Sequence, residues 1–330
     1  MINRIFGGLV MAACLAATPA LAQSTDTVTW LEGEYVGVGA IDMHKLAQRR
    51  IYTYLMNFFA TDKGVRQALT EIRNSGIVLE DVLQRIVVGV PVDVEHSEHI
   101  VMWETSEDLT KYRKILEEHT QIFNVRSHLD VTYYATKREN ECIVLLDKIL
   151  VLGSELRVKE IIASHKNGYR KGPKDAGLKA ELKRVDRKKD AWFVFSLSDS
   201  QRATLRRTDP LIDLPGIGAF QMSEIQRGNL VFDFSKGLDT KASLVMASTE
   251  SATRSSNVLN AVLEDAAGSP DVRDLGLDGF IPGIRSSAQK TDMRLTVVYD
   301  QEKFDSLIAL VTQLAKGVSA PQAKGAATPE

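Results

Sequence analysis

The residue types best suited to binding a charged partner gather in one basic segment. Residues 166–189 hold ten Lys or Arg against three Asp or Glu, a net charge of +7 in 24 residues. Such a cluster attracts anionic surfaces such as lipid headgroups or envelope glycans. A charge run is equally typical of a solvated linker helix, and both interpretations stay open. The cations on its helical part are the candidate contacts: Lys179, Lys183, Arg184, Arg187, Lys188 and Lys189.

An aromatic patch within a predicted helix is the second candidate for binding. Tyr54 and Phe58 lie one helical turn apart, as do Leu55 and Phe59, so apolar side chains cover a wide arc. Aromatic walls suit an amphiphile groove or a protein interface, because they supply area with few rotamers. A core-facing helix is the alternative. The candidate contacts are Tyr52, Tyr54 and Phe58.

Residues with catalytic or metal-binding potential show no motif spacing. The run Glu95-His96-Ser97-Glu98-His99 concentrates imidazoles and carboxylates, but side chains alternate along a strand, so its two histidines point apart. A polar hairpin tip is the preferred interpretation, and we expect neither a metal nor a cofactor. Gly37 and Gly39 lie inside a strand, whereas a dinucleotide-binding glycine loop follows one. Scattered carboxylates can still meet in space, so a hydrolase with a carboxylate pair is the alternative function.

The first 22 residues have the features of a secretory signal peptide. Arg4 precedes an apolar stretch at 5–17, shorter than the ~20 residues that span a bilayer. Ala20-Leu21-Ala22 is the small-x-small pattern that signal peptidase recognises. We therefore expect cleavage near Ala22 and a periplasmic or secreted protein. Lipid modification of Cys14 is the alternative, although the Leu usual in that motif is missing.

The chain that remains after this cleavage has an ordinary globular composition. Loss of Arg4 changes the net charge from −2 to −3, too small to imply a polyionic partner overall, and we expect no nucleic acid partner. No later segment is long and apolar enough to cross a membrane. Cys142 is the one cysteine left, so no intrachain disulfide can form. Its strand-like apolar surroundings predict a buried core residue.

Strands and helices alternate in the same order in both halves of the chain. Residues 35–41 and 192–197 predict strands that precede helices, and Leu83-Gln-Arg85 matches Ile225-Gln-Arg227 before the next strand. The order strand, helix, strand, strand, helix, strand is that of a split β-α-β, ferredoxin-like unit. The predicted fold is therefore α+β, a duplication of two tandem units with antiparallel sheets and helices packed on one face. A single sheet fused across both halves is the alternative.

The expected boundaries between the segments of the chain follow from composition. They are a leader at 1–22, a first unit at 23–165, a basic linker or helix at 166–190, a second unit at 191–315 and a disordered tail at 316–330.

Two segments carry a loose family resemblance. Leu83-Gln-Arg-Ile-Val-Val-Gly-Val-Pro91 and Val231-Phe-Asp-Phe-Ser-Lys-Gly-Leu-Asp239, in this order of elements, resemble exported bacterial proteins of uncharacterised function built from duplicated α+β units. The resemblance spans most of the chain after the leader and implies no activity and no site residues. Together, these features predict an exported, non-enzymatic binding or scaffold protein. Its expected partner is an envelope protein or an amphiphilic or anionic envelope component.

Overall fold

A computed structural model describes most of the chain. The described residues are 26–59, 70, 78–92, 99–118, 123–136, 141–168, 170–207 and 211–318. The predicted leader with Cys14, His96 in the predicted hairpin tip, and the tail beyond Val318 lie outside them.

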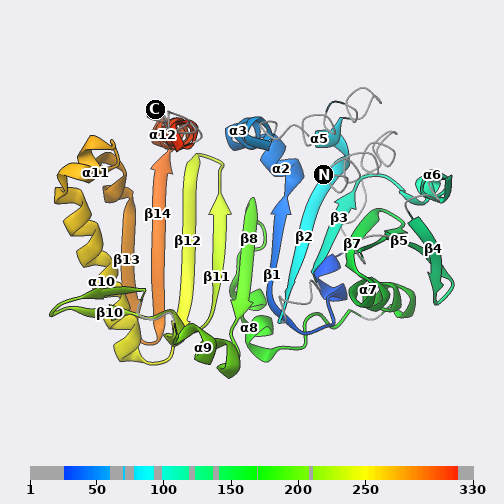
Figure 1. Ribbon diagram of the computed structural model, residues 1–330, viewed down its shortest axis with the longest axis horizontal. Helices are drawn as coiled ribbons and strands as arrows, with labels where there is room; N and C mark the ends of the chain where they lie inside the picture. Colours follow the sequence, from blue (N-terminus) through cyan, green and yellow to red (C-terminus); the bar gives the residue numbers. More distant parts are fainter. Residues whose placement is uncertain are drawn as a thin grey trace, which may run out of the picture.

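One antiparallel sheet of twelve strands runs through both halves of the described chain (Figure 1). The first half contributes β1 (Tyr35–Asp42), β2 (Leu83–Pro91), β3 (Ile100–Thr105), β4 (Phe123–His128), β5 (Val131–Thr136), β6 (Glu141–Leu146) and β7 (Ile149–Ser154). The second half contributes β8 (Ala191–Ser196), β11 (Ile225–Asp233), β12 (Gly237–Met246), β13 (Ile284–Gln289) and β14 (Asp292–Asp300). Their order is β13-β14-β12-β11-β8-β1-β2-β3-β7-β6-β5-β4, and β9 (Ile212–Leu214) and β10 (Gly218–Phe220) form a separate hairpin.

Helices connect these strands and begin at polar caps. Asp42 caps α2, Ser154 caps α7 and Asp175 caps α8, each accepting a hydrogen bond from a backbone N–H in the first turn. The α-helices are α2 (Met43–Ala47), α3 (Arg50–Phe59), α5 (Leu79–Val82), α6 (Arg113–Glu118), α7 (Glu155–Asn167), α8 (Ala176–Arg184), α9 (Asp199–Leu205), α10 (Thr249–Gly268), α11 (Pro270–Asp274) and α12 (Gln301–Val318). The 3-10 helices are η1 (Thr27–Trp30), η2 (Thr110–Tyr112), η3 (Met222–Glu224) and η4 (Asp278–Gly283).

The predicted α+β class with antiparallel pairing is confirmed, but the strands are arranged differently from a split β-α-β unit. Neighbours follow the chain order β1-β2-β3-β7 in the first half and β8-β11-β12-β14 in the second. The reason is that α2 and α3 stay near the end of β1 instead of crossing the sheet, so β2 returns beside β1 (Figure 1). The halves share one sheet because β1 pairs directly with β8.

The two predicted matching tripeptides occupy equivalent places in the two halves. Each opens the second strand of its half, and each carries an irregularity in the pairing with the third strand. The register shifts between Leu83 and Arg85 against β3, and between Ile225 and Arg227 against β12. A β-bulge of this kind bends a strand locally, so both halves bend at the same point.

Helices pack on both faces of the sheet, not on one face as the sequence pattern predicted. On one side, η1, α7 and α8 cover the part of the sheet that runs, in spatial order, β8-β1-β2-β3-β7-β6-β5. The large core there includes Trp30, Ile161 and Leu178. We call this side the covered face. On the other side, helices pack mainly toward the ends and margins of the sheet. The prediction failed because several strands are apolar on both faces, so each face needs its own cover.

Candidate functional site

Strand β8 lies at the centre of the candidate site and is apolar on both sides. Trp192 and Val194 are buried on the covered face. Phe193 and Phe195 point to the opposite side and are only half-buried. A strand without polar alternation is typical of a sheet with both faces covered, so the half-exposed phenylalanines require an explanation.

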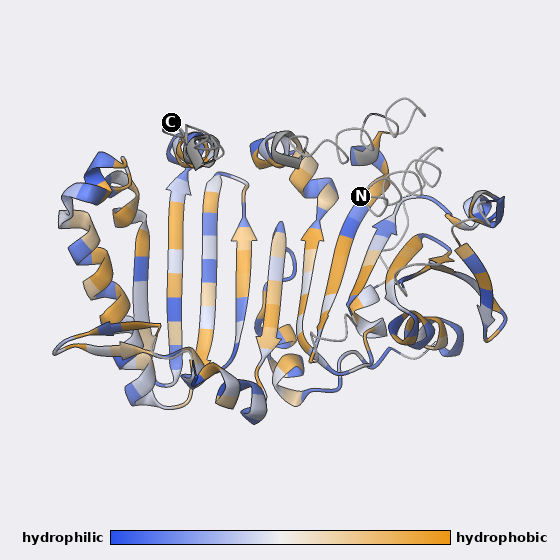
Figure 2. Ribbon diagram, in the orientation of Figure 1, coloured by the Kyte–Doolittle hydropathy of each residue, from blue (hydrophilic) through white to orange (hydrophobic). Residues whose placement is uncertain are grey.

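Half-buried apolar side chains extend from these phenylalanines across the neighbouring strands. In the register of the sheet, Phe193 lies opposite Gly39 on β1 and Leu230 on β11. We call this surface the open face. Its members are Val88, Val101, Phe193, Leu230 and Phe232, with Ile41 at one end and Phe195 at its margin, where Phe195 packs against the core under α10. The strands that carry it are largely hydrophobic along their length (Figure 2).

Glycines on β1 make the open face smooth. A Cβ atom at Gly39 would lie 2.7 Å from Cδ2 of Phe193, and one at Gly37 would meet the same ring. The Phe193 ring therefore lies over the space that side chains at these two positions would fill. The rings of Phe193 and Phe195 are stacked with centroids 6.5 Å apart. The open face is therefore an apolar surface to which β1 contributes only the Ile41 side chain.

Three smaller cores border the open face. One packs α6 and η2 on β5, β6 and β7. Another packs α3 and α12 on one end of β12 and β14, and a third packs α10 on the other end of the same strands. In the part of the chain that the structure describes, no helix crosses the middle of β1, β8 and β11 on this side (Figure 1). The open face is therefore framed by helices without being covered by them.

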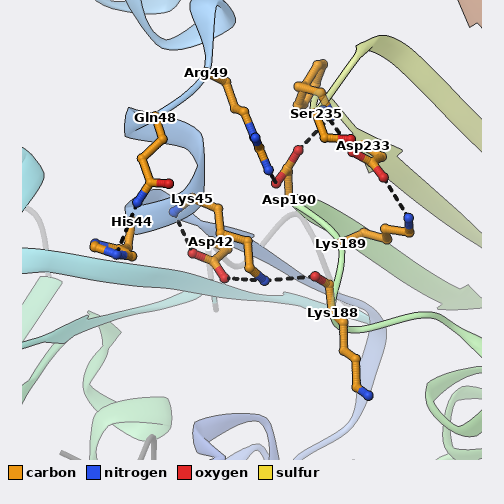
Figure 3. Close-up of polar contacts among 11 residues, drawn as sticks. Asp42, His44, Lys45, Gln48, Arg49, Lys188, Lys189, Asp190, Asp233 and Ser235 are labelled. Carbon is orange, nitrogen blue, oxygen red and sulfur yellow. Dashed lines mark hydrogen bonds and ion pairs between the residues drawn. The ribbon is translucent and has the colours of Figure 1, made fainter. Parts of the chain in front are cut away.

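A cluster of charged residues lies where the open face ends, beyond Ala191 of β8 (Figure 3). Asp190 is its buried centre. One carboxylate oxygen accepts a hydrogen bond from the backbone N–H of Phe234 at 2.6 Å, and the other lies 3.6 Å from the Arg49 guanidinium. The backbone carbonyl of Asp190 accepts a hydrogen bond from the N–H of Asp42. Asp190 thus ties the ends of β1, β8 and β11 to the turn between α2 and α3.

The remaining charges of this end cluster pair mostly with one another. The Lys45 ammonium lies 2.8 Å from the carboxylate of Asp42, and the Lys189 ammonium donates to Asp233 at 2.6 Å. Burial acts to raise the pKa of Asp233, but the hydrogen bonds from Lys189 and Ser235 hold it well below its usual range.

The charges of the cluster are not clearly unbalanced. Its cations, Lys45, Arg49, Lys188 and Lys189, lie among the carboxylates of Asp42, Asp190 and Asp233, and the carboxylates of Asp186 and Asp239 also act on Lys189. The Lys188 side chain points away from the others (Figure 3). Nε of Arg49 is buried without a hydrogen-bond partner.

The structure places the predicted basic residues on or next to α8, which packs on the covered face. Arg184 pairs with Glu181 and Asp292, at 3.0 and 2.8 Å. Arg187 pairs with Asp26 and lies over the Trp192 ring, 5.3 Å from its centroid. These guanidinium groups, like Lys189, attach the segment to the rest of the protein. Four of the predicted cations are exposed: Lys179, Lys183, Lys188 and the paired Arg184.

Two of the predicted aromatic residues, Tyr52 and Tyr54, belong to the border of the open face. Tyr52 is buried in the core between α3 and α12. The Tyr54 hydroxyl donates to Asp305 of α12 at 3.3 Å, and Arg50 lies 2.6 Å from the same carboxylate. The side chain of Phe58 lies outside the described residues. The aromatic helix and the basic segment therefore pack on opposite faces of the sheet, and the structure does not bring them together.

The other residues singled out in the sequence lie in ordinary core or surface positions. Cys142 is buried in the main core, as predicted, and burial raises the pKa of its thiol to about 11. His99 lies 3.5 Å from Glu141 on the surface. Across the described residues, no group of three or more His, Cys, Asp or Glu side chains is placed to hold a metal ion. None of the described helices is long and apolar enough to span a membrane.

Comparison with known proteins gives a fold and no family. No protein-family model and no curated protein matches the chain. A solved structure of TP0453, a Treponema protein, in crystal form III is similar to this chain with a TM-score of 0.51 at 8% identity, covering 88% of this chain and 99% of that one. Crystal form I of TP0453 gives a TM-score of 0.46 at 8% identity, covering 88% and 98%. At this identity the likeness to crystal form III concerns the fold alone.

Sequence reasoning missed the open face, although a signal for it is present. Ala191-Trp-Phe-Val-Phe195 is apolar without interruption, which indicates a strand that needs cover on both sides. Gly37 and Gly39 alternate on the strand beside it. Only the sheet register, which pairs Gly39 with Phe193, reveals that these two features form one surface.

Proposed function

We propose that this chain is an exported, non-enzymatic binding protein that takes the apolar part of an amphiphile on its open face. The observation that carries the proposal is the row of half-buried apolar side chains across β2, β1, β8 and β11, which the described helices frame but leave uncovered. Contiguous exposed apolar surface is uncommon on monomeric proteins and marks binding sites.

The frame favours a flexible ligand over a globular partner. Helices stand at several margins of the open face, and a globular protein would meet them before it reached the strands. A narrow, flexible chain such as an acyl group can lie along the open face between these helices. Sites for such ligands are mostly apolar, with a few polar groups that fix orientation.

The end cluster supports a ligand with an anionic head. It lies where the open face stops, it holds the exposed cation Lys188, and Nε of Arg49 has no hydrogen-bond partner. An anionic group there would pair with these cations while the apolar tail covers Phe232 and Phe193. The carboxylates of the cluster accept from Lys45, Lys189 and the Phe234 N–H. Binding therefore accounts for these contacts better than acid catalysis does.

A fluorescent long-chain fatty acid is a suitable probe. Leu230→Gln removes apolar area from the middle of the open face, and half-burial of that side chain by a ligand is worth about 1 kcal/mol. The double variant Leu230→Gln/Phe232→Gln should lose about 2–3 kcal/mol, a fall in affinity of roughly 30- to 150-fold. Fluorescence titration of the purified chain measures both values.

Val298→Gln is the matched control. Val298 is an apolar strand residue, 53% exposed, on the opposite side of the same sheet. The control should bind the fatty acid as the wild type does. The proposal is refuted if the wild type does not bind the probe, or if the control and the double variant lose affinity equally. Recovery of a tightly held protein instead of lipid, seen by native mass spectrometry of the wild type, would also refute it.

A further inference from the structure

The sheet is open and therefore has two edge strands, β13 and β4 (Figure 1). Each edge exposes the backbone N–H and C=O groups of every second residue, which can pair with another strand. Natural proteins usually block such edges with side chains, helices or charges. The two edges of this sheet differ in this respect.

The β13 edge is blocked by α10. The side-chain amide of Asn260 accepts from the backbone N–H of Ser286 at 3.3 Å and donates to its C=O at 3.2 Å. The Ser286 hydroxyl also donates to Ser256 of the same helix at 3.0 Å. One amide thus occupies both backbone groups that a further strand would use at the centre of β13.

The direction of the backbone groups on β4 follows from its turn. Leu129 and Asp130 link β4 to β5 with φ of 49° and 61°, the two positive values of a type I′ hairpin turn. The flanking pair, His128 and Val131, is then hydrogen-bonded, and such pairs alternate along the ladder. The backbone N–H and C=O groups of Val125 and Ser127 therefore point away from β5.

This part of the β4 edge is accessible. Asn124, Val125, Arg126 and Ser127 are all exposed, and the Val125 side chain is 51% exposed. Within the described chain, no hydrogen bond reaches the outward backbone groups of Val125 and Ser127. The one charged side chain of the strand, Arg126, pairs with Glu155.

We infer that β4 pairs antiparallel with β4 of a second copy of this chain, with Val125 opposite Val125. A two-fold axis perpendicular to the sheet produces this pairing, because antiparallel strands with one shared register residue are self-complementary. The outward groups of Val125 then bond their equivalents, and the two exposed valines bury each other. The interface is separate from the open face and does not depend on the proposed ligand.

Charge selects this register among its neighbours. With Val125 at the axis, Arg126 of one copy lies opposite Asn124 of the other, and their side chains can hydrogen-bond. A shift that brings Arg126 to the axis places like charges directly opposite, which is destabilising. A register with Asn124 at the axis leaves Ser127 without a β4 residue opposite it. That register therefore forms fewer backbone hydrogen bonds between the two copies.

Cysteine cross-linking tests both the assembly and its register. Paired residues of a hydrogen-bonded antiparallel pair have Cα atoms about 5.5 Å apart, within reach of a disulfide. Val125→Cys in a Cys14→Ser chain should therefore form a covalent dimer under mild oxidation. Ser127→Cys is the matched control, because its two copies would lie roughly 13 Å apart and should stay unlinked. Equal cross-linking of both variants would overturn the register.

Proline substitution tests the backbone contact. Val125→Pro removes an N–H that points to the edge and keeps the ladder with β5, so the fold should persist. Sedimentation velocity should show a dimer for the wild type and a monomer for Val125→Pro, with unchanged circular dichroism. Ala288→Pro, at the outward position of the blocked β13 edge, should remain dimeric. A monomeric wild type, or a dimer that survives Val125→Pro, would overturn the inference.

Discussion

The attachment of α8 to the sheet centres on Glu181, a fully buried carboxylate. It accepts hydrogen bonds from Nε of Arg227 at 3.1 Å, from Arg184 at 3.0 Å and from the side-chain amide of Asn229 at 2.7 Å. Glu181→Ala removes the acceptor for all three donors and leaves a cavity. Glu181→Gln keeps the volume and the acceptor for Asn229, and removes the charge.

The loss of folding free energy in these variants depends on how well water can replace Glu181 as the partner of its three donors. Breaking a buried ion pair costs about 3–5 kcal/mol when the remaining charge stays buried. Here the side chains of Arg184 and Arg227 are 37% and 35% exposed, and Arg184 keeps Asp292, so this contribution shrinks to about 1–2 kcal/mol. Buried Asn229 loses an acceptor, which adds about 1–3 kcal/mol. We expect Glu181→Ala to cost about 3 kcal/mol and Glu181→Gln about 1–2 kcal/mol.

Equilibrium urea unfolding measures these differences. Lys183→Ala changes an exposed residue of the same helix and should stay within about 0.5 kcal/mol of the wild type. The reasoning is refuted if Glu181→Ala is as stable as Lys183→Ala. It is also refuted if Glu181→Gln is the more damaging of the two substitutions, because the order of the two variants follows from retaining the Asn229 hydrogen bond.

Two further predictions concern titratable side chains. Hydrogen bonds from Lys159 and Tyr133 lower the pKa of Glu155 to about 2, from an ordinary value of 4.5. Its stabilising contribution is therefore complete above pH 4.5 and lost as the pH falls through about 2. The stability difference between the wild type and Glu155→Gln should shrink across that range in urea unfolding, and a difference that grows toward acid would contradict this. Because burial raises the pKa of the Cys142 thiol to about 11, maleimide labelling at neutral pH should be slow in the native protein and fast in urea; rapid native labelling would contradict the burial.

Local sequence patterns predicted the strands well. The predicted strands at 35–41 and 192–197 correspond to β1, Tyr35–Asp42, and β8, Ala191–Ser196. Ser198 precedes α9 and forms a capping box with Gln201, another feature of neighbouring residues. These features depend on residues a few positions apart, so the sequence carries them directly. Which strand lies beside which depends on how the connections run in space, and the pairing of β1 with β8 has no such local signal.

The basic segment shows why candidate site residues are harder to predict. Its composition correctly marks a helix with many cations, but their partners are remote in the sequence. Arg187 pairs with Asp26, 161 residues away, and Arg184 with Asp292, 108 residues away. An unbalanced local charge of +7 is thus partly neutralised by carboxylates that only the fold brings near. Contact with an anionic surface through Lys179, Lys183 and Lys188 stays a prediction.

The two proposed surfaces lie far enough apart to be tested independently. Seven strand steps separate β8 from β4 in the sheet order, roughly 34 Å at the usual spacing between neighbouring strands. Substitutions at this distance, with no shared partners, normally act additively. Val125→Pro should therefore leave the affinity for the fatty acid unchanged, and Leu230→Gln should leave the sedimentation of the dimer unchanged. If either variant altered both measurements, the open face and the β4 edge would have to be parts of one interface, and the ligand site would need a second copy to be complete.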